Sequence, residues 1–338
     1  MKIIISINRA TIAVDQLRRT FPRDEVILAQ HLDAPGQALP EELIADADVL
    51  FCENVPANFD DFQHLRWLQL CSAGYSHILH LPLIERNIIA TNGTGNFDIP
   101  IAEWCLMMVL VWHRHLLDML ENQRHKRFDR DARYQHELRG STLGIFGYGG
   151  IGRQAARLAR SLGVAVHVLT RDGTVHPRPL HFCEPGTGDP EGTLPDRVFS
   201  SGAMDAFLAG LDYLVLAVPH TKATEKIINE SVLRRLKRSA VLINPARGQL
   251  IDNDALVRAL KEGWIRGASL DTHVEYPISP SYPFWEFPNV ILTPHISGHS
   301  ATDRFVERAF RIFSENLRRF HADEPLLNQL SRNQLSGA

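Results

Sequence analysis

A glycine-rich loop between an apolar run and a helical segment carries the clearest chemistry in the sequence. Gly147-Tyr148-Gly149-Gly150-Ile151-Gly152 follows the apolar run Leu143–Phe146 and precedes Arg153–Arg160, a strong helix former. In a loop of this pattern the first glycine permits a tight turn, the second lets the backbone approach a pyrophosphate, and the third lets helix and strand pack closely. The helix start then attracts the phosphates through its free N–H groups and its dipole. An ordinary glycine-rich turn is the alternative, but strand, loop, helix and second strand occur in the order that dinucleotide binding requires.

The residues at the end of the next strand indicate which dinucleotide binds. An Asp or Glu at this point accepts from the ribose 2′-hydroxyl of NAD, whereas an Arg nearby accommodates the 2′-phosphate of NADP. This chain has Thr170 and Arg171 there, and a guanidinium can hold a phosphate through two parallel hydrogen bonds. Asp172 lies two residues beyond the usual position of the acid. An NAD site in which Asp172 binds the ribose hydroxyl is therefore the alternative. The sequence favours NADP(H), with NAD(H) as the alternative.

Three later segments carry polar side chains directly after predicted strands. They are Asn244-Pro245-Ala246-Arg247-Gly248, Leu270-Asp271-Thr272-His273-Val274-Glu275-Tyr276-Pro277 and Thr293-Pro294-His295-Ile296-Ser297-Gly298. Open parallel sheets bind ligands outside the carboxyl ends of their strands, so these side chains are expected to converge at one edge. Taken singly, an Arg or a His there has an ordinary structural interpretation, and only the joint pattern favours a site.

Together with the glycine loop, these segments resemble the D-isomer-specific 2-hydroxyacid dehydrogenase family. The resemblance extends from about Cys71 to Gly298 and includes Trp285–Val290 and Val218-Pro219-His220-Thr221. It implies hydride transfer between NAD(P)H and a small 2-keto or 2-hydroxy acid, with D stereospecificity, the hydride chemistry itself belonging to the cofactor.

The resemblance also implies roles for particular residues. Arg247 is expected to hold the substrate carboxylate and polarise the keto oxygen, and His295 to donate the proton during reduction. Ser72, Ala73 and Gly74 match a family loop whose backbone N–H groups also hold the carboxylate. The expected cofactor contacts come from the six residues of the glycine loop and from Thr170, Arg171, Val218, Pro219, Thr224, Pro245, Ala246, Arg247, Asp271, His295 and Gly298. No metal site is expected.

One position departs from the family pattern. The family has a Glu shortly before a Pro, five residues after the Asp of the second segment, and this Glu hydrogen-bonds the catalytic His. Here that position holds Tyr276, followed by Pro277, and Glu275 lies one residue early. A shift of one residue in an extended segment points a side chain the other way. We therefore expect Tyr276 to line the substrate site, and His295 either lacks a carboxylate partner or is served by Glu275 through a local bulge.

The elements that must position these residues follow from the alternation of short β-branched runs with helical segments. This alternation predicts an α/β fold with doubly wound parallel sheets and helices on both faces. Eleven runs are too many for one open sheet, so we expect two sheets in two domains. The expected strands are Lys2–Ile7, Glu25–Leu28, Val49–Phe51, Trp67–Leu70, Ile88–Ala90, Leu143–Phe146, Val164–Leu169, Tyr213–Leu216, Ala240–Ile243, Ala268–Leu270 and Val290–Leu292.

The domain division follows from where the dinucleotide loop lies. We expect a flavodoxin-like substrate domain at 1–101 and 299–338, and a Rossmann dinucleotide-binding domain inserted into it at 102–298. Ile101–Arg124 is expected to form one long helix, and Thr302–Phe320 a terminal helix that returns to the first domain. Arg171–Gly202 holds five prolines and five glycines, which predicts an exposed irregular insertion, 172–203, beside the cofactor site.

The composition of the chain indicates which classes of binding partner are excluded. The 338 residues are 44% hydrophobic and 22% charged with a net charge of −3, which argues against nucleic acid or an anionic membrane surface as the main partner. The longest apolar stretch, Trp104–Trp112, is about half of what a membrane helix needs. Four widely separated cysteines predict reduced thiols in a cytoplasmic protein: Cys52, Cys71, Cys105 and Cys183.

The leading hypothesis is an NADP-preferring reductase of small 2-keto acids, such as glyoxylate or hydroxypyruvate. The resemblance implies a homodimer, because the long helix belongs to a dimer arm in the family. A dinucleotide-sensing binding protein, similar to the corepressor relatives in the superfamily, is the second hypothesis, since the missing Glu weakens the case for fast turnover. Oxidation of phosphite or formate is a third.

Overall fold

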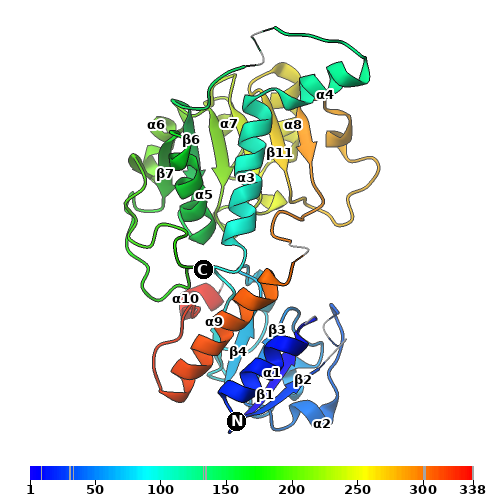
Figure 1. Ribbon diagram of the computed structural model, residues 1–338, viewed down its shortest axis with the longest axis vertical. Coiled ribbons are helices and arrows are strands. Elements are labelled where there is room, and N and C mark those ends of the chain that lie inside the picture. Colours follow the sequence, from blue (N-terminus) through cyan, green and yellow to red (C-terminus); the bar gives the residue numbers. More distant parts are fainter. Residues whose placement is uncertain are drawn as a thin grey trace. The chain divides into compact units, whose positions relative to one another are not determined.

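The computed structural model describes residues 1–8, 10–29, 32, 34–131, 133, 135–299 and 302–336 (Figure 1). The chain divides into two compact units. Unit 1 comprises Met1–Phe97, Pro179–Phe182 and His299–Ala338, and unit 2 comprises Asp98–Arg178 and Cys183–Gly298. Within the described residues, no helix has the length and apolar composition needed to cross a bilayer.

Unit 2 is built on a seven-stranded parallel sheet with the order β12-β11-β10-β9-β6-β7-β8. The first strand in sequence lies inside the sheet and the chain winds outward on both sides of it, which is the Rossmann arrangement. The crevice at such a switch point lies between β6 and β9, which are neighbours. The strands are β6 (Thr142–Phe146), β7 (Ala165–Thr170), β8 (Arg197–Ser200), β9 (Tyr213–Leu216), β10 (Val241–Asn244), β11 (Gly267–Leu270) and β12 (Val290–Leu292).

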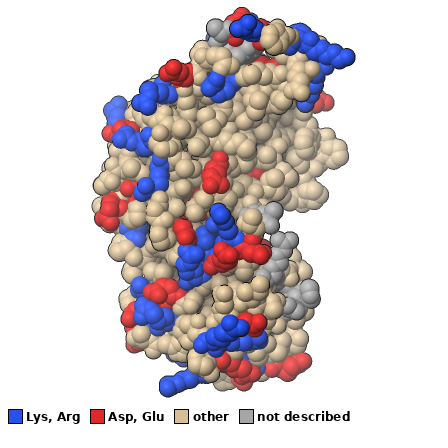
Figure 2. All heavy atoms as spheres, viewed as in Figure 1, with Lys and Arg blue, Asp and Glu red and all other residues tan. Residues whose placement is uncertain are grey.

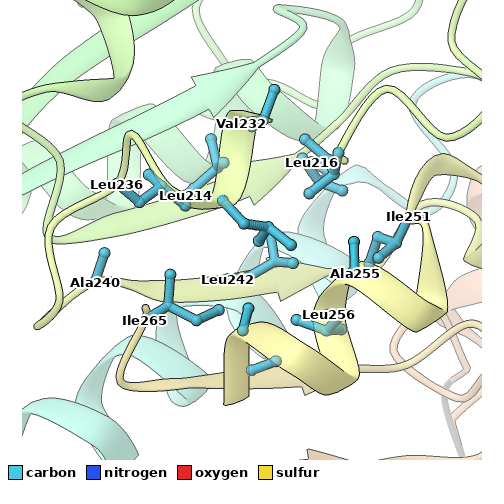
Figure 3. Packing of buried hydrophobic residues seen from close by; sticks show 14 of the residues in the cluster. Leu214, Leu216, Val232, Leu236, Ala240, Leu242, Ile251, Ala255, Leu256 and Ile265 are labelled. Carbon is cyan, nitrogen blue, oxygen red and sulfur yellow. The ribbon is translucent and has the colours of Figure 1, made fainter. Parts of the chain in front are cut away.

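Helices cover both faces of this sheet because its central strands are apolar on both sides. Leu214, Leu216 and Leu242 point into one core, shown in Figure 3, and Tyr213 and Val215 point into the other. The first core is closed by α6 (Met204–Leu208), α7 (Glu230–Leu233) and α8 (Asn253–Glu262), and the second by α3 (Asp98–His113) and α5 (Gly150–Ser161). A sheet buried on both faces needs continuous apolar strands.

Unit 1 holds a five-stranded parallel sheet with the order β2-β1-β3-β4-β5, the flavodoxin-like order. The terminal helix α9 (Arg304–His321) packs on one face together with α1 (Thr11–Thr20), and Phe313 of α9 stacks on Phe51 and Trp67. This confirms a Rossmann domain inserted into a flavodoxin-like one. The remaining elements are β1 (Lys2–Ser6), β2 (Glu25–Leu28), β3 (Val49–Cys52), β4 (Trp67–Leu70), β5 (Ile89–Thr91), α2 (Glu41–Ile44) and α10 (Arg332–Leu335).

The structure contradicts the prediction of one long helix. Instead of a single helix over Ile101–Arg124, α3 ends at His113 and α4 (Leu116–Arg124) begins after a break. His115 adopts φ of 50°, in the left-handed region that an α-helix cannot contain. The apolar periodicity continues through the break, so the sequence pattern alone gave no stop signal.

The Pro/Gly-rich segment contains a strand that composition did not predict. Residues 171–196 form neither helix nor strand, but β8 lies within the expected irregular range 172–203 and is followed by a short 3-10 helix, Ser201–Ala203. β8 pairs with β7 alone, at the edge of the sheet. An edge strand of four residues needs little apolar pattern, which is why it escaped the sequence analysis.

Candidate active site

The first and last glycines of the dinucleotide loop are required by the backbone around them. Gly147 has φ of 95°, and a Cβ there would lie 2.5 Å from the carbonyl oxygen of Ala217. At Gly152 a Cβ would lie 2.5 Å from the carbonyl oxygen of Gly147 and 3.1 Å from Ile145 Cγ2. Real Cβ contacts are not this short, so only glycine lets strand β6, helix α5 and the loop after β9 meet this closely.

The middle glycine serves a different purpose. Gly149 is the N-cap of α5, and the nearest atom to a Cβ built on it is Arg178 Nη1 at 3.7 Å. The space beside Gly149 is therefore open on the protein side, at the start of a twelve-residue helix whose first N–H groups have no partner within the helix. This open cradle fits the pyrophosphate of a dinucleotide.

The ribose end of the site lies after β7. The Arg171 side chain is exposed and makes no ion pair with any described residue. Asp172 is held in a local turn, because its carboxylate accepts from the backbone N–H of Thr174 at 3.1 Å. Hydrogen bonds from Thr174 lower the pKa of Asp172. Thr170 Oγ1 accepts from the backbone N–H of Gly173 at 3.0 Å, which closes the same turn.

The turn that carries Arg247 is shaped by the buried Asn244 at the end of β10. The Asn244 side chain accepts from the N–H of Ala246 at 3.0 Å and donates to the carbonyl of Arg247 at 2.8 Å. At Gly248 a Cβ would lie 2.3 Å from the carbonyl carbon of His273, so the turn packs directly against the loop after β11. Arg247 is half-buried and its Nη1 donates to the carbonyl of Ala246.

The loop that carries His295 is held by a buried carboxylate. Asp271 is fully buried, and its side chain accepts from Thr293 Oγ1 at 2.5 Å and from the N–H groups of Ile296 and Ser297 at 3.0 Å each. These bonds span both sides of His295, whose φ of 56° lies in the left-handed region. A non-glycine residue keeps such a conformation only when its surroundings impose it, and functional sites often do. His295 itself is exposed.

Tyr276 contacts His295. The two ring centroids lie 5.4 Å apart, and the Tyr276 hydroxyl accepts from the backbone N–H of His273 at 2.9 Å. Burial raises the pKa of Tyr276, and the His273 N–H and the charge of Arg247 partly offset the rise. The structure therefore brings together Arg247, Tyr276 and His295, which come from three consecutive strand ends.

Glu275 points elsewhere. Its side chain is exposed, and Oε1 accepts from the backbone N–H of Ser279 at 3.2 Å. The bond closes a local turn four residues along the chain. No ion pair between Glu275 and His295 occurs among the described contacts.

The expected anion-binding loop follows β4 in unit 1. Its carbonyl groups are occupied: Ser72 Oγ donates to Gly74, Asn92 Nδ2 donates to Ala73, and the Gly93 N–H donates to Ser72, at 2.7, 2.8 and 2.8 Å. The N–H groups of Ala73 and Gly74 bond to no described residue. A loop with its carbonyls turned inward and its N–H groups available can hold a small anion.

The loop after β9 is shaped by Thr224. Its hydroxyl donates to the carbonyl of Pro219 at 2.8 Å and accepts from the N–H of Thr221 at 2.8 Å. The Val218 side chain lies 2.6 Å from the Cβ position of Gly147, so this loop borders the glycine loop. The other expected cofactor contacts lie on the strand-end loops already described: Pro245, Ala246 and Gly298.

A Rossmann sheet with this glycine loop, with an Arg on the loop after β10 and with a His on the loop after β12, defines a dinucleotide-dependent oxidoreductase. The family model described as D-isomer specific 2-hydroxyacid dehydrogenase, NAD binding domain, matches residues 106–297. The chain belongs to this family and is an NAD(P)-dependent D-2-hydroxyacid dehydrogenase.

Similar proteins agree with this assignment over nearly the whole chain. A glyoxylate reductase of Thermofilum pendens is 32% identical over 304 residues, which cover 87% of this chain and 84% of that protein. A glyoxylate reductase of Thermococcus kodakarensis is 32% identical over 328 residues, covering 91% and 93%. The crystal structure of a D-isomer specific 2-hydroxyacid dehydrogenase family protein from Aeromonas salmonicida superposes with a TM-score of 0.80 at 26% identity, covering 98% of each chain.

Sequence reasoning missed two charged residues beside the glycine loop. A Cβ on Gly150 would lie 1.8 Å from Asp98 Oδ2, so the first residue of α3 packs its carboxylate against the start of α5. Arg178 approaches Gly149 from within the insertion. Neither lies in a recognisable motif, and their proximity depends on tertiary folding.

Proposed function

We propose that this protein is an NADPH-preferring reductase of small 2-keto acids such as glyoxylate or hydroxypyruvate, forming the D-2-hydroxy acid. The observation that carries the proposal is the convergence of Arg247, Tyr276 and His295 at the strand ends of a dinucleotide-binding sheet. The names of the two relatives, both glyoxylate reductases, support the substrate class.

The roles of the residues follow from their chemistry. The nicotinamide, when bound, supplies the hydride. Arg247 holds the substrate carboxylate and polarises the keto oxygen, since its guanidinium is permanently charged and directional. His295 transfers a proton from an imidazole nitrogen to that oxygen. The free N–H groups of Ala73 and Gly74, in unit 1, can bind a small anion such as a carboxylate. Tyr276 orients the imidazole by ring contact and lines the substrate site.

The preference for NADPH rests on Arg171. Its exposed guanidinium has no competing carboxylate among the described residues, whereas Asp172 is engaged by the N–H of Thr174. A free guanidinium suits the 2′-phosphate, and Asp172 lies two residues beyond the position from which an acid usually reads the ribose hydroxyl.

We also propose a homodimer in the cytoplasm. Apolar side chains are exposed along the outer side of α3 and α4, including Met107 at 47%, Leu110 at 38% and Leu116 at 41%. They line a groove together with Val111 and Met119. Figure 2 shows a largely uncharged surface where Figure 1 draws α3. Such a patch is typical of an interface, and a second copy of the chain is the occupant we propose. The four free cysteines agree with a reducing compartment.

The test of the proposed reaction is consumption of NADPH at 340 nm with a panel of 2-keto acids. We expect turnover with glyoxylate and hydroxypyruvate, and D-glycerate as the product from hydroxypyruvate. Tight cofactor binding without turnover of any keto acid would support the dinucleotide-sensing alternative and overturn the enzymatic one. Oxidation of phosphite or formate in the reverse assay, without keto-acid reduction, would favour the third hypothesis.

A further inference from the structure

The irregular insertion is fastened to the helix that follows the glycine loop. Arg153, on the first turns of α5, is 6% exposed, and its guanidinium donates to the carbonyls of Tyr148, His176 and Asp189. Gln154 Oε1 accepts from the N–H of Gly188 at 2.6 Å, and Arg157 Nε donates to the carbonyl of Gly188 at 2.5 Å. A buried guanidinium that donates to several carbonyl groups holds the backbone segments that carry them in one geometry.

A buried carboxylate completes the attachment. Asp189 is 3% exposed, accepts from the Tyr148 hydroxyl at 2.7 Å, and accepts from the N–H groups of Thr193 and Leu194 at 3.0 Å each. Burial alone would raise the pKa of Asp189, but these hydrogen bonds outweigh it and lower the pKa. Tyr148 is a residue of the glycine loop itself, so the insertion and the loop form one hydrogen-bonded structure.

This attachment places Arg178 beside the glycine loop. The Arg178 N–H donates to the carbonyl of Pro190 at 3.2 Å, within the fastened segment. Its Nη1 lies 3.7 Å from the Cβ position of Gly149, on the open side of that glycine. The Arg178 guanidinium is half-buried, and it forms no hydrogen bond and no ion pair with any described residue. Its N–H donors are therefore available to a ligand at the glycine loop.

Arg178 lies near a second cation, Arg153, and near the carboxylate of Asp98. Burial lowers the pKa of Arg178, and the neighbouring charge of Arg153 lowers it further, while the charge of Asp98 partly opposes both. Arg153 already donates to carbonyl groups through each of its three nitrogens. An anion placed between Arg178 and the start of α5 would satisfy the guanidinium and the free N–H groups together.

We propose that Arg178, delivered by the insertion, binds the pyrophosphate of the dinucleotide across the loop from Gly149. The Pro/Gly-rich insertion is thus part of the cofactor site, and its ligand is the diphosphate that NAD and NADP share. This inference rests on dinucleotide binding by the family and is independent of the preference for NADP and of the substrate.

The test is calorimetric binding of NADH and NADPH to wild-type protein and to Arg178→Ala. Loss of a charge-assisted, bidentate contact is expected to weaken both cofactors by about tenfold or more, and by similar factors, since both carry the diphosphate. Arg178→Lys should recover part of the affinity through its charge. Arg171→Ala is the matched control, because it is expected to weaken NADPH and leave NADH unchanged.

Three outcomes contradict the proposal. Unchanged affinity for NADH in a folded Arg178→Ala protein shows that the guanidinium does not contact the diphosphate. Loss confined to NADPH shows that it contacts the 2′-phosphate instead. If Arg178→Ala lowers the thermal midpoint of the protein, the binding measurement is made on Arg178→Gln instead. Wild-type affinity of Arg178→Gln for NADH then overturns the proposal. Wild-type protein that binds neither cofactor would refute dinucleotide binding itself, a separate failure.

Discussion

The position of His295 is fixed by hydrogen bonds and a ring contact that neighbouring residues make. The Asp271 carboxylate accepts from the Thr293 hydroxyl before His295 and from the backbone N–H groups of Ile296 and Ser297 after it. Tyr276 contacts the His295 ring. The sequence identified Arg247, His295 and Tyr276 as a group because their motifs follow successive strands. It did not identify Asp271 as the residue that shapes the loop. An Asp that contacts a ligand and an Asp that is a buried hydrogen-bond acceptor look the same in the sequence.

The first prediction concerns the proton donor and its surroundings. Reduction requires a protonated imidazole at His295, so kcat is expected to fall as pH rises through the midpoint of the profile. Because Glu275 bonds the Ser279 N–H, Glu275→Gln should leave that midpoint unchanged. The measurement is kcat against pH for wild type and variant. A carboxylate partner contributes a shift of about one unit or more, so a shift of that size toward acid pH would show that Glu275 serves His295.

At the scale of elements, strand and helix patterns predicted most of the sheet. The apolar runs are continuous in buried strands and are bounded by polar or glycine residues, and eleven of the strands follow from them. β8 was missed because an edge strand lacks that pattern, and the break at His115 was missed because apolar residues continue on both sides of it. The attachment of the insertion through Arg153 and Asp189 was also missed, since it depends on residues far apart in the sequence.

The second prediction separates two glycines of the loop. Gly152→Ala places a Cβ 2.5 Å from the Gly147 carbonyl oxygen, which is expected to cost about 1–3 kcal/mol of unfolding free energy. Gly149→Ala meets no protein atom closer than 3.7 Å and should keep the wild-type thermal midpoint. It should nevertheless lose dinucleotide affinity, because its Cβ occupies the approach of the pyrophosphate. Thermal unfolding and cofactor titration of both variants check this pair. Full cofactor affinity in Gly149→Ala would be incompatible with the proposed approach.

At the scale of the whole molecule, the presence of two parallel sheets was predictable from the number and alternation of the runs. The path of the chain through the insertion was not predictable in this way. Pro179–Phe182 belongs to unit 1 while the residues on both sides of it belong to unit 2, so the insertion adds two passages of the chain between the units. The segment is fixed in unit 1 by Asn328, which accepts from the Phe182 N–H at 3.1 Å and donates its own N–H to the Leu180 carbonyl at 2.9 Å. No local pattern encodes such a long-range contact.

The third prediction concerns assembly. Light scattering on a sizing column is expected to give about twice the chain mass of 38.1 kDa. Met107→Asp combined with Leu110→Asp should give the monomer, because charges replace apolar side chains in the groove on α3. Ile12→Asp on α1 is the control, since Ile12 is 75% exposed and lies outside the groove. A wild-type monomer, or dissociation by Ile12→Asp alone, would contradict the proposed interface.

The most direct test of the central claim is the ratio of kcat/KM for NADPH to kcat/KM for NADH, measured with glyoxylate as the substrate. Since Arg171 is the exposed cation at the ribose end, the ratio is expected to exceed one in wild-type protein and to fall by about tenfold or more in Arg171→Ala, chiefly through loss of activity with NADPH. A ratio below one in wild type, or one that Arg171→Ala leaves unchanged, would contradict the account, and so would the absence of glyoxylate reduction with either cofactor.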